Sequence, residues 1–212
     1  MVILSAATAP PQLVSMSHAL YGRGWMEGTS GNLSVLAPGD RGRALITASG
    51  RAKHALTARD IVAVTVADGR PVDPGGPRPS AETAIHTALY RSVKDCAAVI
   101  HAHSPHATAL ASLAGRRGEE ALRLADYELI KGLDVEDPRT VDIPVFPNWP
   151  DVPQIGSDVA AYAGRAGWPL PPVLLIAHHG ATVWGPDLET ARNRLECLEA
   201  LCHLVLLTHR HR

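Results

Sequence analysis

Two short histidine clusters, each at the end of an apolar run, are the residues best suited to bind a metal ion. His101 and His103 flank one alanine, and because strand side chains alternate, both face one side of the chain, about 6 to 7 Å apart. A half-exposed strand explains this pair equally well when it is taken alone. His178 and His179 follow another apolar run, and alternation lets only one of them face the same site. Three neutral imidazoles with one open position are typical of catalytic zinc.

Three loops rich in small and hydroxyl residues could bind an anion. They are residues 28–32, 47–50 and 78–80. Consecutive backbone N–H groups in such loops can form an anion-binding nest, and a helix that starts after the third loop adds a favourable dipole. The first loop lacks the lysine of a P-loop and the spacing of a dinucleotide fingerprint. Each loop alone is more simply a turn or a helix cap, but together with a metal site they favour a phosphate ligand.

Composition limits the classes of partner. The chain has 212 residues, of which 46% are hydrophobic, and 20 basic residues face 21 acidic ones. This balance argues against nucleic-acid binding, so any anion is expected to be held locally and by mostly neutral groups. No apolar run approaches the roughly 20 residues of a membrane span. Three cysteines without a CxxC motif, and a start at residues 1–4 that lacks a basic region, predict a cytoplasmic protein without disulfides.

The elements that must position these residues alternate between helix and strand. A Pro/Gly cluster at 71–79 is read as an internal loop, so we predict one domain over residues 1–212 with a core of about 11–209. Several strands follow one another too closely for helical crossovers, which favours a mixed, largely antiparallel sheet with flanking helices. Ser80 is expected to cap a helix. Helices are predicted at 11–25, after 80, at 105–113, at 155–166 and from 187, and strands at 32–36, 44–48, 61–66, 97–103, 141–146, 173–177 and 181–184.

Five motifs occur in a fixed order along the chain: TSGNLS, ITASG, RPSAETAIH, VIHAHSPHATAL and AHHG. Over about residues 13–207 this order resembles the class II aldolase and adducin family. The resemblance implies a single-domain three-layer α/β/α sandwich, one Zn²⁺ per subunit, a small sugar-phosphate substrate and a homotetramer with sites near subunit interfaces. It places the zinc ligands on His101, His103 and His179. It places the phosphate-binding positions on Thr29, Asn32, Ser49, Gly50 and Ser80.

Two glutamates are candidates for the acid/base of such an enzyme. The segment 125–132, ADYELIKG, is similar to the methylthioribulose-1-phosphate dehydratase branch of the family, in which the glutamate at the position of Glu128 is the acid/base. Segments 144–148 and 183–185 also resemble that branch. Glu82 is similar in position to the acid/base of the family's aldolases. Without the resemblance, Glu128 is a solvated carboxylate on a short helix, and Glu82 is a favourable charge in a first helical turn.

The resemblance therefore implies a lyase of methionine salvage that removes water from 5-methylthioribulose 1-phosphate. Its nearest rival is a class II sugar-phosphate aldolase or epimerase, which would use the same metal and phosphate groups. A third alternative is an adducin-like binding module without catalysis, but the intact metal-ligand positions count against it.

Overall fold

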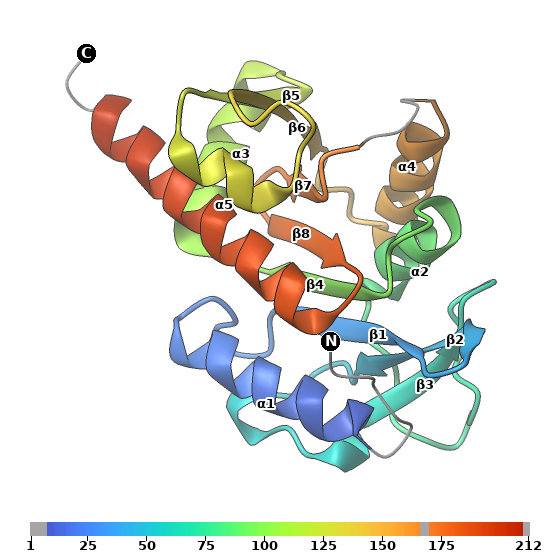
Figure 1. The fold of residues 1–212 in the computed structure, drawn as a ribbon. Coiled ribbons are helices and arrows are strands. Elements are labelled where there is room, and N and C mark those ends of the chain that lie inside the picture. The colour runs from blue at the N-terminus through green and yellow to red at the C-terminus, as the bar shows by residue number, and fades with distance from the viewer. Residues whose placement is uncertain (1–7, 166–169, 210–212) are drawn as a thin grey trace.

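Eight strands form one mixed sheet at the centre of the computed structural model, which describes residues 8–165 and 170–209 (Figure 1). Their order across the sheet is β3-β2-β1-β4-β8-β7-β6-β5, and among these strands only β6 and β7 pair in parallel. The predicted mixed, largely antiparallel sheet is thus confirmed. The strands are β1 (Asn32–Ala37), β2 (Asp40–Thr47), β3 (Ile61–Thr65), β4 (Ala98–Ala102), β5 (Ala121–Ala125), β6 (Thr140–Phe146), β7 (Val173–Ile176) and β8 (Gly180–Gly185).

Helices cover both faces of the sheet, which confirms the three-layer α/β/α architecture (Figure 1). Helices α1, α3 and α5 pack on one face, and α2 and α4 pack together on the other. Three short 3-10 helices, η1, η2 and η3, lie in the connections. The helices are α1 (Ala9–Gly22), α2 (Thr83–Ser92), α3 (Pro105–Arg117), α4 (Val152–Arg165), α5 (Leu188–His209), η1 (Lys53–Ala55), η2 (Ala58–Asp60) and η3 (Glu128–Leu133).

The central strand β4 shows how one apolar run serves two cores. Ile100 and Ala102 join the core under α1, α3 and α5, whereas Val99 joins the core under α2 and α4. This follows from the two-residue alternation of a strand, and a strand buried on both faces reads as a continuous apolar run. His101 follows Val99 by two residues, so β4 directs it toward the face covered by α2 and α4.

The start of α2 differs from the sequence prediction. The helix begins at Thr83 with Glu82 in the N-cap position, so Ser80 lies outside the helix instead of capping it. The Ser80 hydroxyl donates a hydrogen bond to the Glu82 carboxylate, at 2.7 Å, and this contact competes with a cap. The helix prediction was right in type but began too early.

Other element boundaries differ by a few residues, and three short elements were not predicted. Helix α1 ends at Gly22, because Gly24 adopts a left-handed conformation (φ 71°) that stops the helix before residue 25. Strand β5 and the short 3-10 helices η1 and η2 were missed, whereas the short helix suggested at Glu128 is present as η3. The predicted end of a helix at Ala166 and the start of the chain, residues 1–4, lie outside the described residues.

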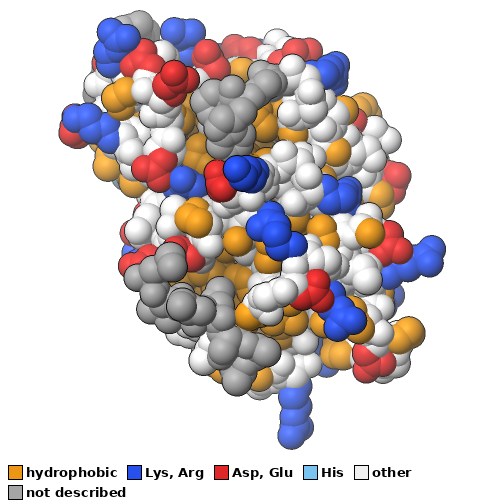
Figure 2. All heavy atoms as spheres, turned by 45° about the vertical axis from the view of Figure 1, so that its right-hand side comes forward, with side chains coloured by type: hydrophobic (Ala, Val, Ile, Leu, Met, Phe, Trp, Pro, Cys, Tyr) orange, Lys and Arg blue, Asp and Glu red, His pale blue; other side chains and the backbone are white. Residues whose placement is uncertain are grey.

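The surface shown in Figure 2 carries basic and acidic side chains that are interspersed over the whole face. No broad basic area gathers on this face, as expected from the nearly equal numbers of acidic and basic residues. Among the described helices, none combines the length and the apolar character that crossing a bilayer requires. Absence of nucleic-acid and membrane partners stays a prediction.

Candidate metal centre and anion pocket

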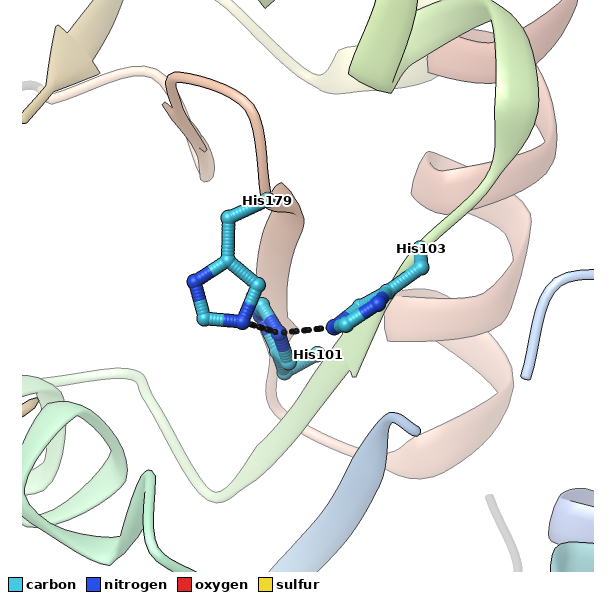
Figure 3. Close-up of side chains that lie close together, drawn as sticks. All are labelled: His101, His103 and His179. Atoms are coloured by element: carbon cyan, nitrogen blue, oxygen red, sulfur yellow. Dashed lines mark hydrogen bonds between the residues drawn. The ribbon is translucent and has the colours of Figure 1, made fainter. Parts of the chain in front are cut away.

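Three histidine rings converge at the end of β4 (Figure 3). His101 Nε2 lies 3.1 Å from His103 Nε2 and 3.3 Å from His179 Nε2. The three rings stand edge to face, with centroids 4.8 to 5.1 Å apart. The structure thus brings together the three residues predicted as metal ligands, and His178, the alternative to His179, is exposed and faces a separate cavity.

The spacing of these nitrogens fits a metal ion. Zinc–nitrogen bonds of about 2.0 to 2.1 Å in a tetrahedral site place neighbouring ligand nitrogens about 3.3 Å apart. The two separations from His101 Nε2, 3.1 and 3.3 Å, agree with this value. His101 Nδ1 also lies 3.0 Å from Thr182 Oγ1, a contact that orients the ring behind its ligand atom. The donor set is therefore suitable for a zinc-like divalent ion.

Burial keeps these imidazoles neutral, the form that binds a metal. The pKa of His103 is lowered to about 4, mainly by burial and then by the neighbouring His179. Burial and both other rings hold the pKa of His101 well below its usual range, and burial also lowers the pKa of His179. Near pH 7 protons therefore do not compete with a cation for these nitrogens.

The turn between β7 and β8 aims His179 at the other two rings. His178 takes a left-handed conformation (φ 58°), which is uncommon for a residue with a side chain and reverses the chain direction within two residues. Gly180 follows, and a Cβ there would overlap with the carbonyl oxygen of Ala102 and lie 3.1 Å from the His103 ring. The glycine thus permits the close approach of β8 to β4 on which the site depends.

His103 is fixed by the helix that follows it. The backbone N–H of His103 donates to the Trp25 carbonyl, at 2.9 Å, and two residues later α3 begins with Pro105 as predicted. The buried Glu199 carboxylate from α5 accepts from the N–H groups of His106 and Ala107, at 2.9 Å each. These bonds satisfy free N–H groups in the first turn of α3 and hold it against α5.

Glu82 connects the histidine cluster to the polar loops. Its Oε2 accepts hydrogen bonds from Asn32 Nδ2, at 2.8 Å, and from Ser80 Oγ, at 2.7 Å, while Oε1 lies 3.7 Å from His179 Nε2. Asn32 on β1 is paired directly with His101 on β4, and this pairing brings the loop of residues 28–32 to the metal site. Sequence spacing alone did not place Glu82 here; only the likeness to aldolases did.

A cavity of about 270 Å³ lies beside the histidines and gathers the predicted loops. Thr29, Ser49, Gly50 and Ser80 line it, together with Glu82 and His103. Asn32 is not a lining residue but contacts Glu82 behind the wall. A buried lysine, Lys53, also lines the cavity and was missed by the sequence reading. Its place three residues after Gly50 was the only available signal.

Glu128 lies elsewhere on the chain. It opens η3, which packs on α5, and its side chain is 81% exposed in an ion pair with Lys131, at 2.8 Å. It does not line the cavity beside the histidines. Within one chain, therefore, the structure brings Glu82 and not Glu128 into that cavity.

Almost the whole chain matches a known protein family. The model of the class II aldolase and adducin N-terminal domain matches residues 11–206 of the chain. The chain belongs to the class II aldolase and adducin family. Family membership confirms the resemblance drawn from the five motifs. The crystal structure of L-fuculose-1-phosphate aldolase from Thermus thermophilus has the same fold, with a TM-score of 0.72 and 28% identity over 96% of this chain and 95% of that one.

Two curated relatives cover almost the whole chain. A protein of Nocardia farcinica, named "Probable bifunctional methylthioribose-1-phosphate isomerase/methylthioribulose-1-phosphate dehydratase", is 52% identical over 97% of this chain. The chain spans only 36% of that relative's length. A protein of Sorangium cellulosum named methylthioribulose-1-phosphate dehydratase is 40% identical over 96% of this chain and 93% of its own length.

Proposed function

We propose that this chain is a methylthioribulose-1-phosphate dehydratase. It converts 5-methylthioribulose 1-phosphate to 2,3-diketo-5-methylthiopentyl 1-phosphate and water, a step of methionine salvage. The similarity to the Sorangium relative over nearly the full length of both proteins is the observation that carries this proposal. The three histidines beside a polar cavity supply a site of the right chemistry.

His101, His103 and His179 would hold one Zn²⁺ per subunit. The spacing of their nitrogens and the neutrality of their rings support this assignment. When bound, such an ion supplies Lewis-acid stabilisation of negative charge that develops on substrate oxygens. Thr29, Ser49, Gly50 and Ser80 would bind the phosphate and so position the reacting carbons.

Glu128 is the proposed acid/base. It takes the proton from C3, next to the C2 carbonyl, and gives it to the C4 hydroxyl as that group leaves as water. The resulting enol then ketonises to the 2,3-diketone. One carboxyl thus serves as base and then as acid, and no external reagent is consumed.

The exposed position of Glu128 leads us to assign it to the site of a neighbouring subunit. Among the described residues of one chain it is paired only with Lys131, and it lies outside the cavity beside the histidines. A homotetramer whose sites lie near subunit interfaces would place η3 of one copy beside the histidines of another. This oligomer, in the cytoplasm, forms part of the proposal.

The decisive assay follows the products. Purified zinc-loaded protein is incubated with 5-methylthioribulose 1-phosphate, and diketone formation is monitored by absorbance and mass spectrometry. The same preparation is tested for aldehyde release from fuculose 1-phosphate and rhamnulose 1-phosphate. We expect diketone and no aldehyde. Aldehyde release without diketone formation would overturn the proposal.

An aldolase or epimerase is the second candidate, and one observation favours it. Glu82 lies 3.7 Å from His179 and lines the cavity, as the acid/base of the family's aldolases would. In the dehydratase this carboxylate instead orients Asn32 and Ser80, to which it is already hydrogen bonded. A non-catalytic adducin-like module is the third alternative, and the absence of bound metal after mild purification would favour it.

A further inference from the structure

The lysine in the wall of the cavity is unusually buried. Lys53, in η1, is 1% exposed and is among the largest fully buried side chains of the described residues. Lysine is almost never fully buried unless its charge is paired. No carboxylate of the described residues lies within ion-pair distance of Lys53. The fold therefore carries a cation at a place where solvation is poor and no protein anion neutralises it.

The hydrogen bonds of Lys53 leave one of its donors free. Nζ donates to the carbonyl oxygens of Thr29 and Arg51, at 2.9 Å each. An ammonium group has three N–H donors, so these two bonds account for all but one. Thr29 precedes β1 and Arg51 follows β2, and Lys53 thus joins two loops that also line the cavity through Thr29, Ser49 and Gly50.

Charge in the cavity favours an anionic ligand. Burial, the stronger influence, lowers the pKa of Lys53, and the negative charge of Glu82 raises it. Glu82 already accepts hydrogen bonds from Asn32 and Ser80 and does not reach Lys53 as an ion pair. Burying an unpaired charge is costly, and an anion bound in the cavity would offset that cost.

We infer that Lys53 binds the phosphate group of the substrate. Its third N–H donates to a phosphate oxygen, while its two carbonyl contacts hold the ammonium at the cavity wall. The overall composition led us to expect a phosphate site of mostly neutral groups, and Lys53 adds one positive charge to that site. This inference rests on the proposed function, because it takes the ligand to be a sugar phosphate.

The chain contains so few lysines that the Lys53 ammonium group can be observed directly by NMR. The chain has 3 lysines among its 20 basic residues, namely Lys53, Lys94 and Lys131, and the other two are exposed. Selective ¹⁵N labelling of lysine in the zinc-loaded full chain gives three ammonium signals at most. Inorganic phosphate is then titrated. We expect the signal that is absent in Lys53→Met to shift on saturation, while those of Lys94 and Lys131 stay in place.

Affinity for inorganic phosphate measures the contribution of the charge. Lys53→Met keeps the length of the side chain and removes its charge, and we expect phosphate to bind about 10- to 100-fold more weakly, with zinc content unchanged. Arg51→Met is the matched control, because the Arg51 side chain is 61% exposed, pairs with Asp60 and does not line the cavity. We expect its affinity for phosphate to stay within about twofold of the wild type.

A purely structural role for Lys53 predicts a different result. If the lysine only ties the two loops, Lys53→Met lowers kcat/KM for the dephosphorylated sugar as much as for the phosphorylated substrate. Phosphate binding by Lys53 predicts a loss confined to the phosphorylated substrate. A folded, zinc-loaded Lys53→Met that binds phosphate within about twofold of the wild type overturns the inference. So does phosphate-saturated wild-type protein in which none of the three lysine ammonium signals shifts, and this result holds even if the variant does not fold.

The two proposals fail separately. Wild-type protein that forms no diketone contradicts the dehydratase, yet its phosphate affinity still reports on Lys53. Conversely, a normal dehydration rate with a phosphate site indifferent to Lys53→Met leaves the function intact and removes only Lys53.

Discussion

Substitution of single residues tests whether Glu128 or Glu82 transfers the proton during dehydration. Glu128→Gln keeps the size of the side chain and removes the base, so we expect turnover to fall by about two to four orders of magnitude while zinc stays bound. Glu82→Gln should cost less, because an amide at this position still accepts hydrogen bonds from Asn32 and Ser80. Dehydration rates and zinc content of the two variants give the comparison. If Glu82→Gln is inactive and Glu128→Gln keeps a near-normal rate, Glu82 is favoured as the acid/base, as in the family's aldolases.

The adjacent residues His178 and His179 test which histidine side chain binds the metal. His179→Asn removes a ligand nitrogen and should lose the metal. His178→Asn should keep it, because asparagine tolerates the left-handed conformation (φ 58°) and His178 lies outside the cluster. Plasma emission spectroscopy of both purified variants measures bound zinc. Equal loss in the two variants would show that the turn, and not the ring of His179, is what matters.

Residue-level prediction from the sequence worked best where local geometry was sufficient. His101 and His103 share a strand face by alternation, so their convergence needed no knowledge of the fold. Lys53 was missed because its burial depends on two loops, around Thr29 and Arg51, that meet only after β1 and β2 have paired. A lysine in a loop is normally solvated, and nothing local marks this one as different.

At the scale of elements, the approach of β8 to β4 depends on Gly180. Gly180→Ala would place a Cβ against the Ala102 carbonyl and the His103 ring, so β8 must move away from β4. We expect loss of stability by about 1–3 kcal/mol together with weaker zinc binding. Denaturant unfolding and zinc titration measure both. Gly22→Ala in α1 is the control, since its Cβ meets no described atom within 4 Å, and it should be neutral or stabilising. Unchanged zinc affinity in Gly180→Ala would contradict this account.

Most helices and strands were predicted because their apolar periodicity is strong. The missed strand β5 lacks such a pattern. Strand β5 lies at the edge of the sheet, and of its five residues only Leu124 is buried. Alanine and arginine are not typical strand residues, so the segment gave no strand signal. The sheet order could not be predicted either, because β4 pairs with β8 across about 80 residues of chain that no local pattern connects.

For the molecule as a whole, mixed oligomers test whether Glu128 serves another subunit. Glu128→Gln and His101→Ala chains are each inactive alone, but a hybrid contains sites with intact histidines from one chain and Glu128 from its neighbour. Random mixing should restore about a quarter of wild-type turnover. The control pair His101→Ala with His179→Ala should restore none, since both ligands come from one chain. Verified hybrids without recovered activity would contradict the shared site.

Global stability should depend on pH through His86, a buried histidine outside the group of His101, His103 and His179. Burial lowers the pKa of His86 to about 3, while an unfolded histidine has a pKa near 6.5. Between these values the unfolded chain binds a proton that the folded His86 does not, so this residue alone lowers stability by about 1.4 kcal/mol for each unit by which pH falls. Urea unfolding of metal-free protein between pH 4 and 7 measures this slope. His86→Asn should flatten it by that amount, and an identical slope would contradict the assignment.

The order of strands in the sheet links metal binding to the folding of the chain. Strands β1 to β4 form one half of the sheet and β5 to β8 the other, and the halves meet where β4 pairs with β8. His101 and His103 come from the first half and His179 from the second. A complete three-histidine site therefore exists only after the two halves have docked, and a cation held by all three joins them across the seam. Metal affinity and the free energy of docking are thus thermodynamically linked: whatever separates the halves must also release the ion.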